Sequence, residues 1–230
     1  MQKPALILRA YIRAINAQRP PPLQFDFSAL ITMNSRTASH TATAPWSAVL
    51  YRNKWTICAL LFVATTNNYM DRQIFGLLAP TLQKAIGWSE LDYGYIITAF
   101  QAAYAFGQLF IGGVLDRIGT RIGLAAIVSG WSLASIAHAF VNTAFGFGAA
   151  RFFLGATEAG MFPAGVETVS EWFPKRQRAL ATGIFNAGTN VGAVLTPLLI
   201  PWITIQFGWR WAFAVTALTG VIFLIFWLWI

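Results

Sequence analysis

The sequence predicts an all-α integral membrane protein, because it is rich in apolar residues, poor in charge, and carries its charges between long apolar stretches. Hydrophobic residues make up 57% of the 230 residues and charged residues only 10%, against about 25% charged in ordinary soluble domains. The mean hydropathy is +0.57. Apolar runs of about 20 residues recur, which is the length a helix needs to cross a bilayer.

The chain divides into a basic amino-terminal tail, residues 1–54, and a predicted bundle of six transmembrane helices, residues 55–230. The fourth and fifth spans are long enough to need tilt or to protrude from the membrane. The connections are short, so no soluble domain fits between the spans. By hydropathy and flanking charge, the spans lie at 55–79, 93–115, 122–140, 145–171, 179–203 and 210–230.

The distribution of Lys and Arg predicts that both ends of the bundle face the cytoplasm. Residues 1–54 carry seven Lys or Arg and one acidic residue. The second-to-third connection contains Arg117 and Arg121, and the fourth-to-fifth connection reads "FPKRQRA". Lys and Arg accumulate on the cytoplasmic side of membrane proteins, so these three segments mark that side. The same rule explains the basic tail, and no nucleic-acid partner is expected.

The two ends of the chain raise separate questions. The stretch "ALILRAYIRAI" places apolar residues on one helical face and could form a helix lying on the membrane surface. The alternatives are a poorly ordered tail or a misplaced start, with Met33 as the true first residue. At the other end, Ile230 closes the apolar run "LTGVIFLIFWLWI" without a polar residue, as expected for a truncated product.

Two adjacent charges, Asp71 and Arg72, interrupt the apolar first span. From Trp55 to Asp71 is 16 residues, or roughly 24 Å of helix, so both charges are expected in the outer half of the membrane. Such charges cost several kcal/mol unless they are paired or hydrated, and they usually mark substrate or proton sites. A structural ion pair with a neighbouring helix is the alternative.

The fourth span supplies a second pair of charges, Arg151 and Glu158. Their spacing of seven residues places them on one helical face, two turns apart. Counted by helical rise, Arg151 lies at the depth of Arg72, and Glu158 lies deeper. We expect these charges to share one hydrated cavity with Asp71 and to exchange partners there, as a proton-coupled carrier of anions requires.

The fifth span combines small and polar residues. Gly188 and Gly192 form a small-xxx-small pair, which lets two helix backbones approach closely. Asn186 and Asn190 share one face and Thr189 lies beside them, so one of these faces is expected to look into a cavity.

The connection "GGVLDRIGTR" carries the sharpest motif in the sequence. A generic basic turn is one interpretation. The pattern, however, closely resembles the signature loop of the major facilitator superfamily between its second and third helices, apart from Thr120, where a basic residue is usual. In that family the loop latches the two halves of the transporter and tunes the conformational cycle. The matching residues are Gly112, Asp116, Arg117, Gly119 and Arg121.

The resemblance extends over about residues 50–230 and includes "NNYMDRQIFG", "ARFFLGATEAGMFPAG", "SEWFPKRQRALATGIFNAGTNVGA" and "GWRWAF". Within the superfamily the chain looks like the anion:cation symporters, and most like bacterial hexuronate and other sugar-acid transporters. This implies a bacterial inner-membrane protein. Family members have twelve helices in two six-helix halves with the site between them, so this chain would supply the N-terminal half and need a C-terminal half as partner.

The resemblance also implies roles for single residues. Arg72 would bind the substrate carboxylate. Tyr69 and Tyr104 would form hydrogen bonds with the sugar acid, and Arg151 would form ion pairs with the residues that carry protons. The implied substrate-binding residues are Arg72, Tyr69, Tyr104, Thr189 and Asn190, and the implied proton-coupling residues are Asp71, Glu158 and Arg151.

The expected function is therefore proton symport of a small organic anion, a hexuronate or related sugar acid, with protons as the coupling ion and no other cofactor. Sodium coupling, another carboxylate substrate, or a non-transporting membrane sensor are the alternatives. An enzyme is not expected, because the spans contain no nucleophile–base pair. The one cysteine and two histidines form no metal-site spacing, and His138 is expected to serve packing.

Overall fold

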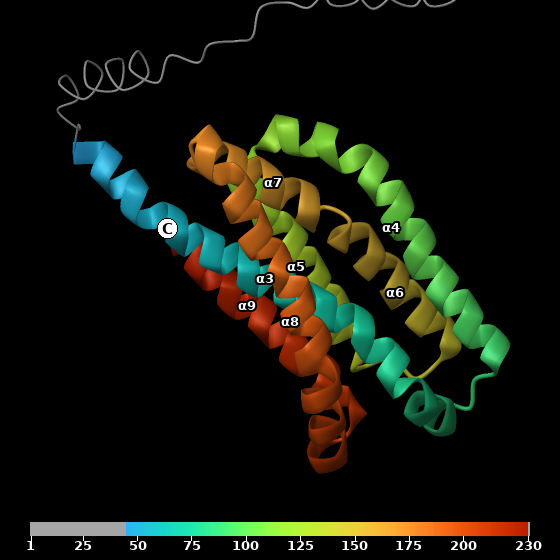
Figure 1. Ribbon diagram of the computed structural model, residues 1–230. Helices are drawn as coiled ribbons and strands as arrows, with labels where there is room; N and C mark the ends of the chain where they lie inside the picture. The colour runs from blue at the N-terminus through green and yellow to red at the C-terminus, as the bar shows by residue number, and fades with distance from the viewer. Residues whose placement is uncertain (1–44, 230) are drawn as a thin grey trace, which may run out of the picture. The chain divides into compact units, whose positions relative to one another are not determined.

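The structure is a computed structural model that describes residues 45–229, with side chains from Lys54 onward. These residues form an all-helical bundle (Figure 1). The proposed surface helix in the tail and the alternative start at Met33 lie outside the described residues. The helices are α3 (Pro45–Ile86), α4 (Glu90–Ile118), α5 (Thr120–His138), α6 (Ala144–Glu158), α7 (Met161–Trp172), α8 (Lys175–Phe207) and α9 (Trp209–Trp229).

Five of the six predicted spans correspond to single helices, whereas the fourth, 145–171, corresponds to two, α6 and α7. The break has a local cause. Pro163 lacks the N–H that would bond the carbonyl of Ala159, and proline is tolerated in the first turn of a new helix. At the junction, a side chain on Gly160 would collide with Ile127 of α5, so the turn packs closely against that helix.

Four of the described helices, α4, α5, α8 and α9, are individually long and apolar enough to cross a membrane. α6 and α7 have 15 and 12 residues and would cross only in series. α3 has 42 residues and carries a run of polar and charged residues, 65–72, in its middle. Sequence composition alone therefore understates the number of spans where a helix is broken or charged.

The bundle is built from three close helix pairs: α4 packs on α6, α3 on α8, and α5 on α9. Figure 1 shows α4 running beside α6. Gly188 and Gly192 of α8 lie against α3, where an added Cβ would stand 2.5 Å from the carbonyl oxygen of Phe62 and 2.6 Å from that of Thr66. The close approach predicted from the small-xxx-small pair is thereby confirmed.

The buried apolar residues form two clusters, and α3 contributes to both. Ile57 and Leu61 belong to one cluster, whereas Ile74 and Leu78 belong to the other. The polar run 65–72 lies between these two parts of α3. Buried polar groups need partners, so this middle layer is where neighbouring helices must supply them.

Candidate functional site

A cavity of about 270 Å³ opens in the polar middle layer. Residues from α3, α4, α7 and α8 line it, together with Glu158 at the end of α6. Most of the lining side chains carry a hydrogen-bonding group, so the cavity suits a polar ligand. The lining residues are Thr65, Asn68, Tyr69, Arg72, Tyr104, Gln108, Glu158, Met161, Phe162, Phe185, Asn186 and Thr189.

An ion pair between Arg72 and Glu158 forms one wall of the cavity. Arg72 Nε donates to Glu158 Oε2 at 2.8 Å, and no other ion pair is found among the described residues. The glutamate side chain is fully buried, whereas 29% of the arginine side chain is exposed. The other nitrogens of the Arg72 guanidinium remain available to an anion in the cavity.

Aromatic rings support the Arg72 guanidinium. Its Cζ lies 4.3 Å from the centroid of the Tyr104 ring, within the range of a cation–π contact. The Tyr104 hydroxyl in turn accepts a hydrogen bond of 2.8 Å from Gln108, one turn further along α4. These contacts hold the arginine beside the cavity and place two further polar groups next to it.

Asp71 and Arg151 are buried outside the cavity lining. Arg151 Nη1 donates to the backbone carbonyl of Asp71 at 3.3 Å, and its guanidinium stacks 4.4 Å from the Phe75 ring. The Asp71 carboxylate accepts a hydrogen bond of 2.6 Å from Ser135 of α5. The expected four-charge cavity is therefore wrong: Arg72 and Glu158 face it, while Asp71 and Arg151 lie behind it.

The other predicted binding residues are placed unevenly. Tyr69, Tyr104 and Thr189 line the cavity, whereas Asn190 is exposed and does not. Asn186, one turn earlier on α8, lines it instead.

Three polar lining residues, Thr65, Asn68 and Gln108, were missed by sequence reasoning. Asn68 and Gln108 lie four residues from Arg72 and Tyr104, respectively. The i,i+4 relation on a helix was the signal that could have identified both.

The loop motif shapes the turn between α4 and α5. Gly119 has a φ of +76°, which favours glycine. Arg121 donates through Nη2 to the carbonyl of Leu228 at 2.8 Å, and Trp227 Nε1 donates to the carbonyl of Arg121 at 2.9 Å. The start of α5 is thus fastened to the end of α9. Gly112, Asp116 and Arg117 are all exposed.

His138 is buried in an aromatic cluster. Its ring stacks on Phe213 with centroids 4.9 Å apart, and its Nδ1 lies 2.7 Å from the carbonyl oxygen of Ala134. These contacts confirm that this histidine serves packing.

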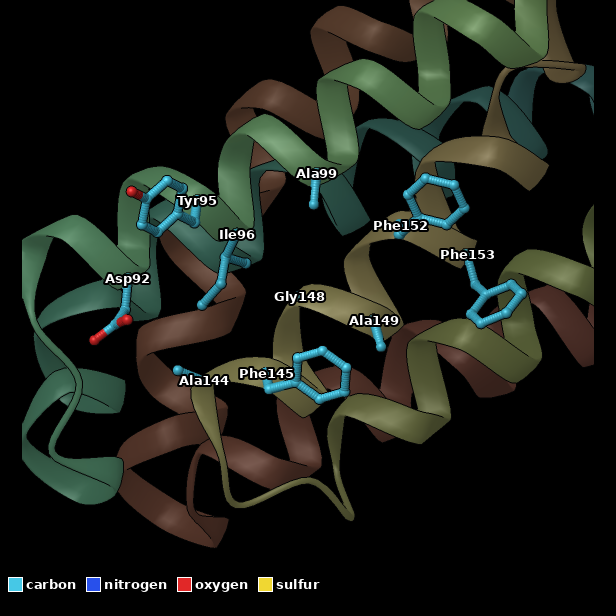
Figure 2. A pocket seen from close by; sticks show the side chains of 10 residues that line it. All are labelled: Asp92, Tyr95, Ile96, Ala99, Ala144, Phe145, Gly148, Ala149, Phe152 and Phe153. Carbon is cyan, nitrogen blue, oxygen red and sulfur yellow. The ribbon is translucent and has the colours of Figure 1, made fainter.

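A second, wider pocket of about 560 Å³ lies between α4 and α6. Figure 2 shows the side chains that line it. Its lining is mainly apolar and includes Phe145, Phe152 and Phe153 of α6. The one charged residue is Asp92, whose pKa is held below its usual range by hydrogen bonds from the backbone and side chain of Ser89. This pocket contains no cation to bind an anion, so the Arg72 cavity is the candidate site.

Long apolar helices of the length that crosses a membrane thus surround a cavity lined by polar and charged side chains. Residues 61–230 match the family described as Major Facilitator Superfamily. The chain therefore belongs to the Major Facilitator Superfamily, and its helices correspond to the N-terminal six-helix half of that fold. The resemblance drawn from the loop motif is confirmed.

Two relatives are similar over most of the chain. The galacturonate transporter of Dickeya chrysanthemi is 36% identical over 175 residues, covering 76% of this chain and 51% of the relative. The hexuronate transporter of Escherichia coli (strain K12) is 37% identical over 175 residues, covering 76% and 40%. The chain thus spans about half the length of these relatives.

A solved structure supports the fold. A bacterial homolog to the human lysosomal transporter Spinster, in an inward-facing and unoccupied conformation, aligns with a TM-score of 0.65 at 19% identity. The alignment covers 75% of this chain and 42% of that structure.

Proposed function

We propose that the chain forms the N-terminal half of a carrier that moves a sugar-acid anion, a hexuronate or a close relative, by proton symport. The observation that carries this proposal is the Arg72–Glu158 ion pair in the cavity wall. The names of the relatives, a galacturonate and a hexuronate transporter, support the substrate class. The proposed location is the bacterial inner membrane, with both ends of the bundle in the cytoplasm.

The ion pair couples the anion to a proton through one shared partner. A substrate carboxylate that binds Arg72 competes with Glu158 for the same guanidinium. A proton on Glu158 neutralises its carboxylate, weakens its hold on Arg72 and leaves the guanidinium to the substrate. Because such coupling is reciprocal, a bound anion also favours protonation of Glu158. Asp71 is proposed as a second proton carrier, and Arg151 as the cation that stabilises it.

The remaining lining fits a polyhydroxylated anion. Asn68, Tyr69, Gln108, Asn186 and Thr189 offer donors and acceptors around the guanidinium. In transporters built from two halves the site lies between them, so we propose that a second six-helix half covers this cavity. The loop around Asp116 and Arg117 would then regulate the movement of one half against the other.

The test is uptake of labelled galacturonate by cells that express the complete reading frame encoding this chain. Arg72→Ala should abolish uptake, because the anion loses its charged partner. Glu158→Gln, which imitates the protonated acid, should retain exchange of labelled for unlabelled galacturonate across the membrane. It should lose accumulation driven by a proton gradient.

Matched controls are Arg210→Ala and Glu167→Gln, which make the same changes outside the cavity and should leave uptake within about twofold of wild type. Unchanged uptake in both Arg72→Ala and Glu158→Gln would refute the proposal. Accumulation that follows a sodium gradient instead would refute proton coupling, and binding without uptake would indicate a sensor.

A further inference from the structure

The Asp71 carboxylate points away from the cavity, although its neighbour Arg72 lines it. Asp71 is 1% exposed and is absent from the cavity lining. Ser135 Oγ donates to its Oδ1 at 2.6 Å, and Oδ2 has no hydrogen-bond partner among the described residues. Ser135 therefore makes the shortest contact that orients this carboxylate, and the Thr216 hydroxyl of α9 lies close by as a second polar neighbour.

Ser135 donates its hydroxyl hydrogen to another helix rather than to its own backbone. Several hydroxyls bond the carbonyl four residues back in their own helix, as Ser129 does with Ala125 at 2.7 Å and Thr168 with Ala164 at 2.7 Å. Thr120 and Thr219, like Ser135, instead donate to a side chain of another helix. Ser135 is fully buried, yet its hydroxyl reaches across to another helix. The Ser135 hydroxyl could also have donated to a backbone carbonyl of its own helix. The need for a hydrogen bond alone therefore does not explain its contact with Asp71.

The contact belongs to a junction of three helices. Ser135 Oγ also lies 3.5 Å from Thr216 Oγ1 of α9, and the carbonyl of Thr216 accepts a hydrogen bond of 3.1 Å from Asn67 Nδ2 of α3. The polar middle of α3 is thus attached to α5 and α9, two helices that contribute no residue to the cavity lining. The charged groups near Asp71 are Arg72 on its own helix and Arg151 and Glu158 on α6. On α9 the one charged residue, Arg210, lies in the first turn.

We propose that Ser135 is a positioning residue that holds the Asp71 carboxylate outside the substrate cavity, so that Asp71 takes part in proton coupling without touching the substrate. Its role in coupling rests on the proposed function, whereas its control of the Asp71 carboxylate does not. A proton bound at Asp71 would then act on the contacts of α3 with α5 and α9. Glu158 would act directly on the guanidinium that binds the anion.

The positioning is tested by infrared difference spectroscopy on the 230-residue chain in lipid. Subtracting the spectrum of Asp71→Asn identifies the band of the Asp71 carboxyl group. Ser135→Ala should move that band to higher wavenumber, because the carboxyl loses its donated hydrogen bond, and Ser135→Thr should restore it. Ser129→Ala, the same change at an intrahelical hydroxyl, should leave the band in place. An unmoved band in a folded Ser135→Ala chain would overturn the positioning role.

The role in coupling is tested by transport in the complete reading frame. Ser135→Ala should leave the KM for galacturonate within about twofold, because the cavity is untouched, while gradient-driven accumulation falls by about tenfold. The size follows from a hydrogen bond to a charged group, which is commonly equivalent to a factor of ten or more. A raised KM with normal accumulation would overturn the coupling role. Loss of uptake in the wild type would count against the proposed function alone, since the infrared result is independent of transport.

Discussion

At the scale of single residues, Phe100 of α4 lies close to two arginines, the half-buried Arg72 and the buried Arg151. The Cζ atoms of Arg72 and Arg151 both lie 5.8 Å from the centroid of its ring. The same ring stacks with Tyr104, the closer aromatic partner of Arg72. An aromatic face is attracted to each cation, so the ring supports two like charges within one buried layer.

Replacement of this ring should weaken anion binding. Phe100→Leu keeps an apolar side chain but removes one aromatic face from Arg72, and a desolvated cation–π contact contributes about 0.5–2 kcal/mol. The KM for galacturonate uptake should rise by roughly two- to thirtyfold. Phe100→Tyr preserves the aromatic face and should rescue binding, and Phe152→Leu, the same change at an exposed ring, should have no effect. Equal effects at Phe100 and Phe152 would contradict this explanation.

The charged residues of the site could be predicted from the sequence better than the groups that each of them contacts. Intramembrane charge singled out Arg72 and Glu158, and the structure pairs them. Asp71 and Arg72 are adjacent in sequence, but successive side chains on a helix point about 100° apart. The sequence therefore could not indicate that one faces the cavity and the other faces Ser135. Asn186 and Asn190 share one face of α8, so the prediction of Asn190 where Asn186 lines the cavity was an error of one turn along the helix.

At the scale of helices, glycine sets how closely the elements pack around the site. Gly192 brings α8 against the carbonyl of Thr66, one residue beyond the cavity-lining Thr65. In α6, a side chain on Gly155 would collide with the backbone of Phe100 in α4. These contacts fix the distance between the helices that carry Arg72, Tyr104 and Glu158. The pair Gly188-x-x-x-Gly192 could be recognised in the sequence by its spacing. Gly155 has no second glycine four residues away in α6, so its contact with α4 could not be recognised in this way.

Two identical substitutions in α8 should separate packing from helix propensity. Gly192→Ala places a Cβ 2.6 Å from the carbonyl oxygen of Thr66 and should destabilise the bundle by about 1–3 kcal/mol. Gly183→Ala meets nothing within 4 Å and should be neutral or stabilising by up to about 1 kcal/mol, since alanine favours helix. Thermal unfolding of both variants in the same detergent measures the difference. A Gly192→Ala chain as stable as Gly183→Ala would show that the close approach is not required.

The break in the fourth span shows what hydropathy cannot report. Residues 145–171 were predicted as one span, although Arg151 and Glu158 lie within them. The interruption depends on Pro163 and on the contact of Gly160 with Ile127 of another helix. The proline was visible in the sequence, but proline is common in transmembrane helices. The tertiary contact that fixes the turn was not visible.

At the scale of the whole molecule, the distribution of Lys and Arg predicts a membrane topology that can be measured directly. Arg176 lies in the first turn of α8, next to the predicted cytoplasmic connection. Lys84 lies near the end of α3, beyond the outer end of the predicted first span. Both are exposed. The one natural cysteine, Cys58, is buried, so it interferes little with labelling and can be replaced by serine. Because Lys and Arg are retained on the cytoplasmic side, the two positions should lie on opposite sides of the membrane.

A membrane-impermeant maleimide should therefore label Lys84→Cys in intact spheroplasts, and Arg176→Cys only after the membrane is permeabilised. The parent with Cys58→Ser provides the unlabelled control for both. The reversed pattern would invert the bundle and place the basic connections outside.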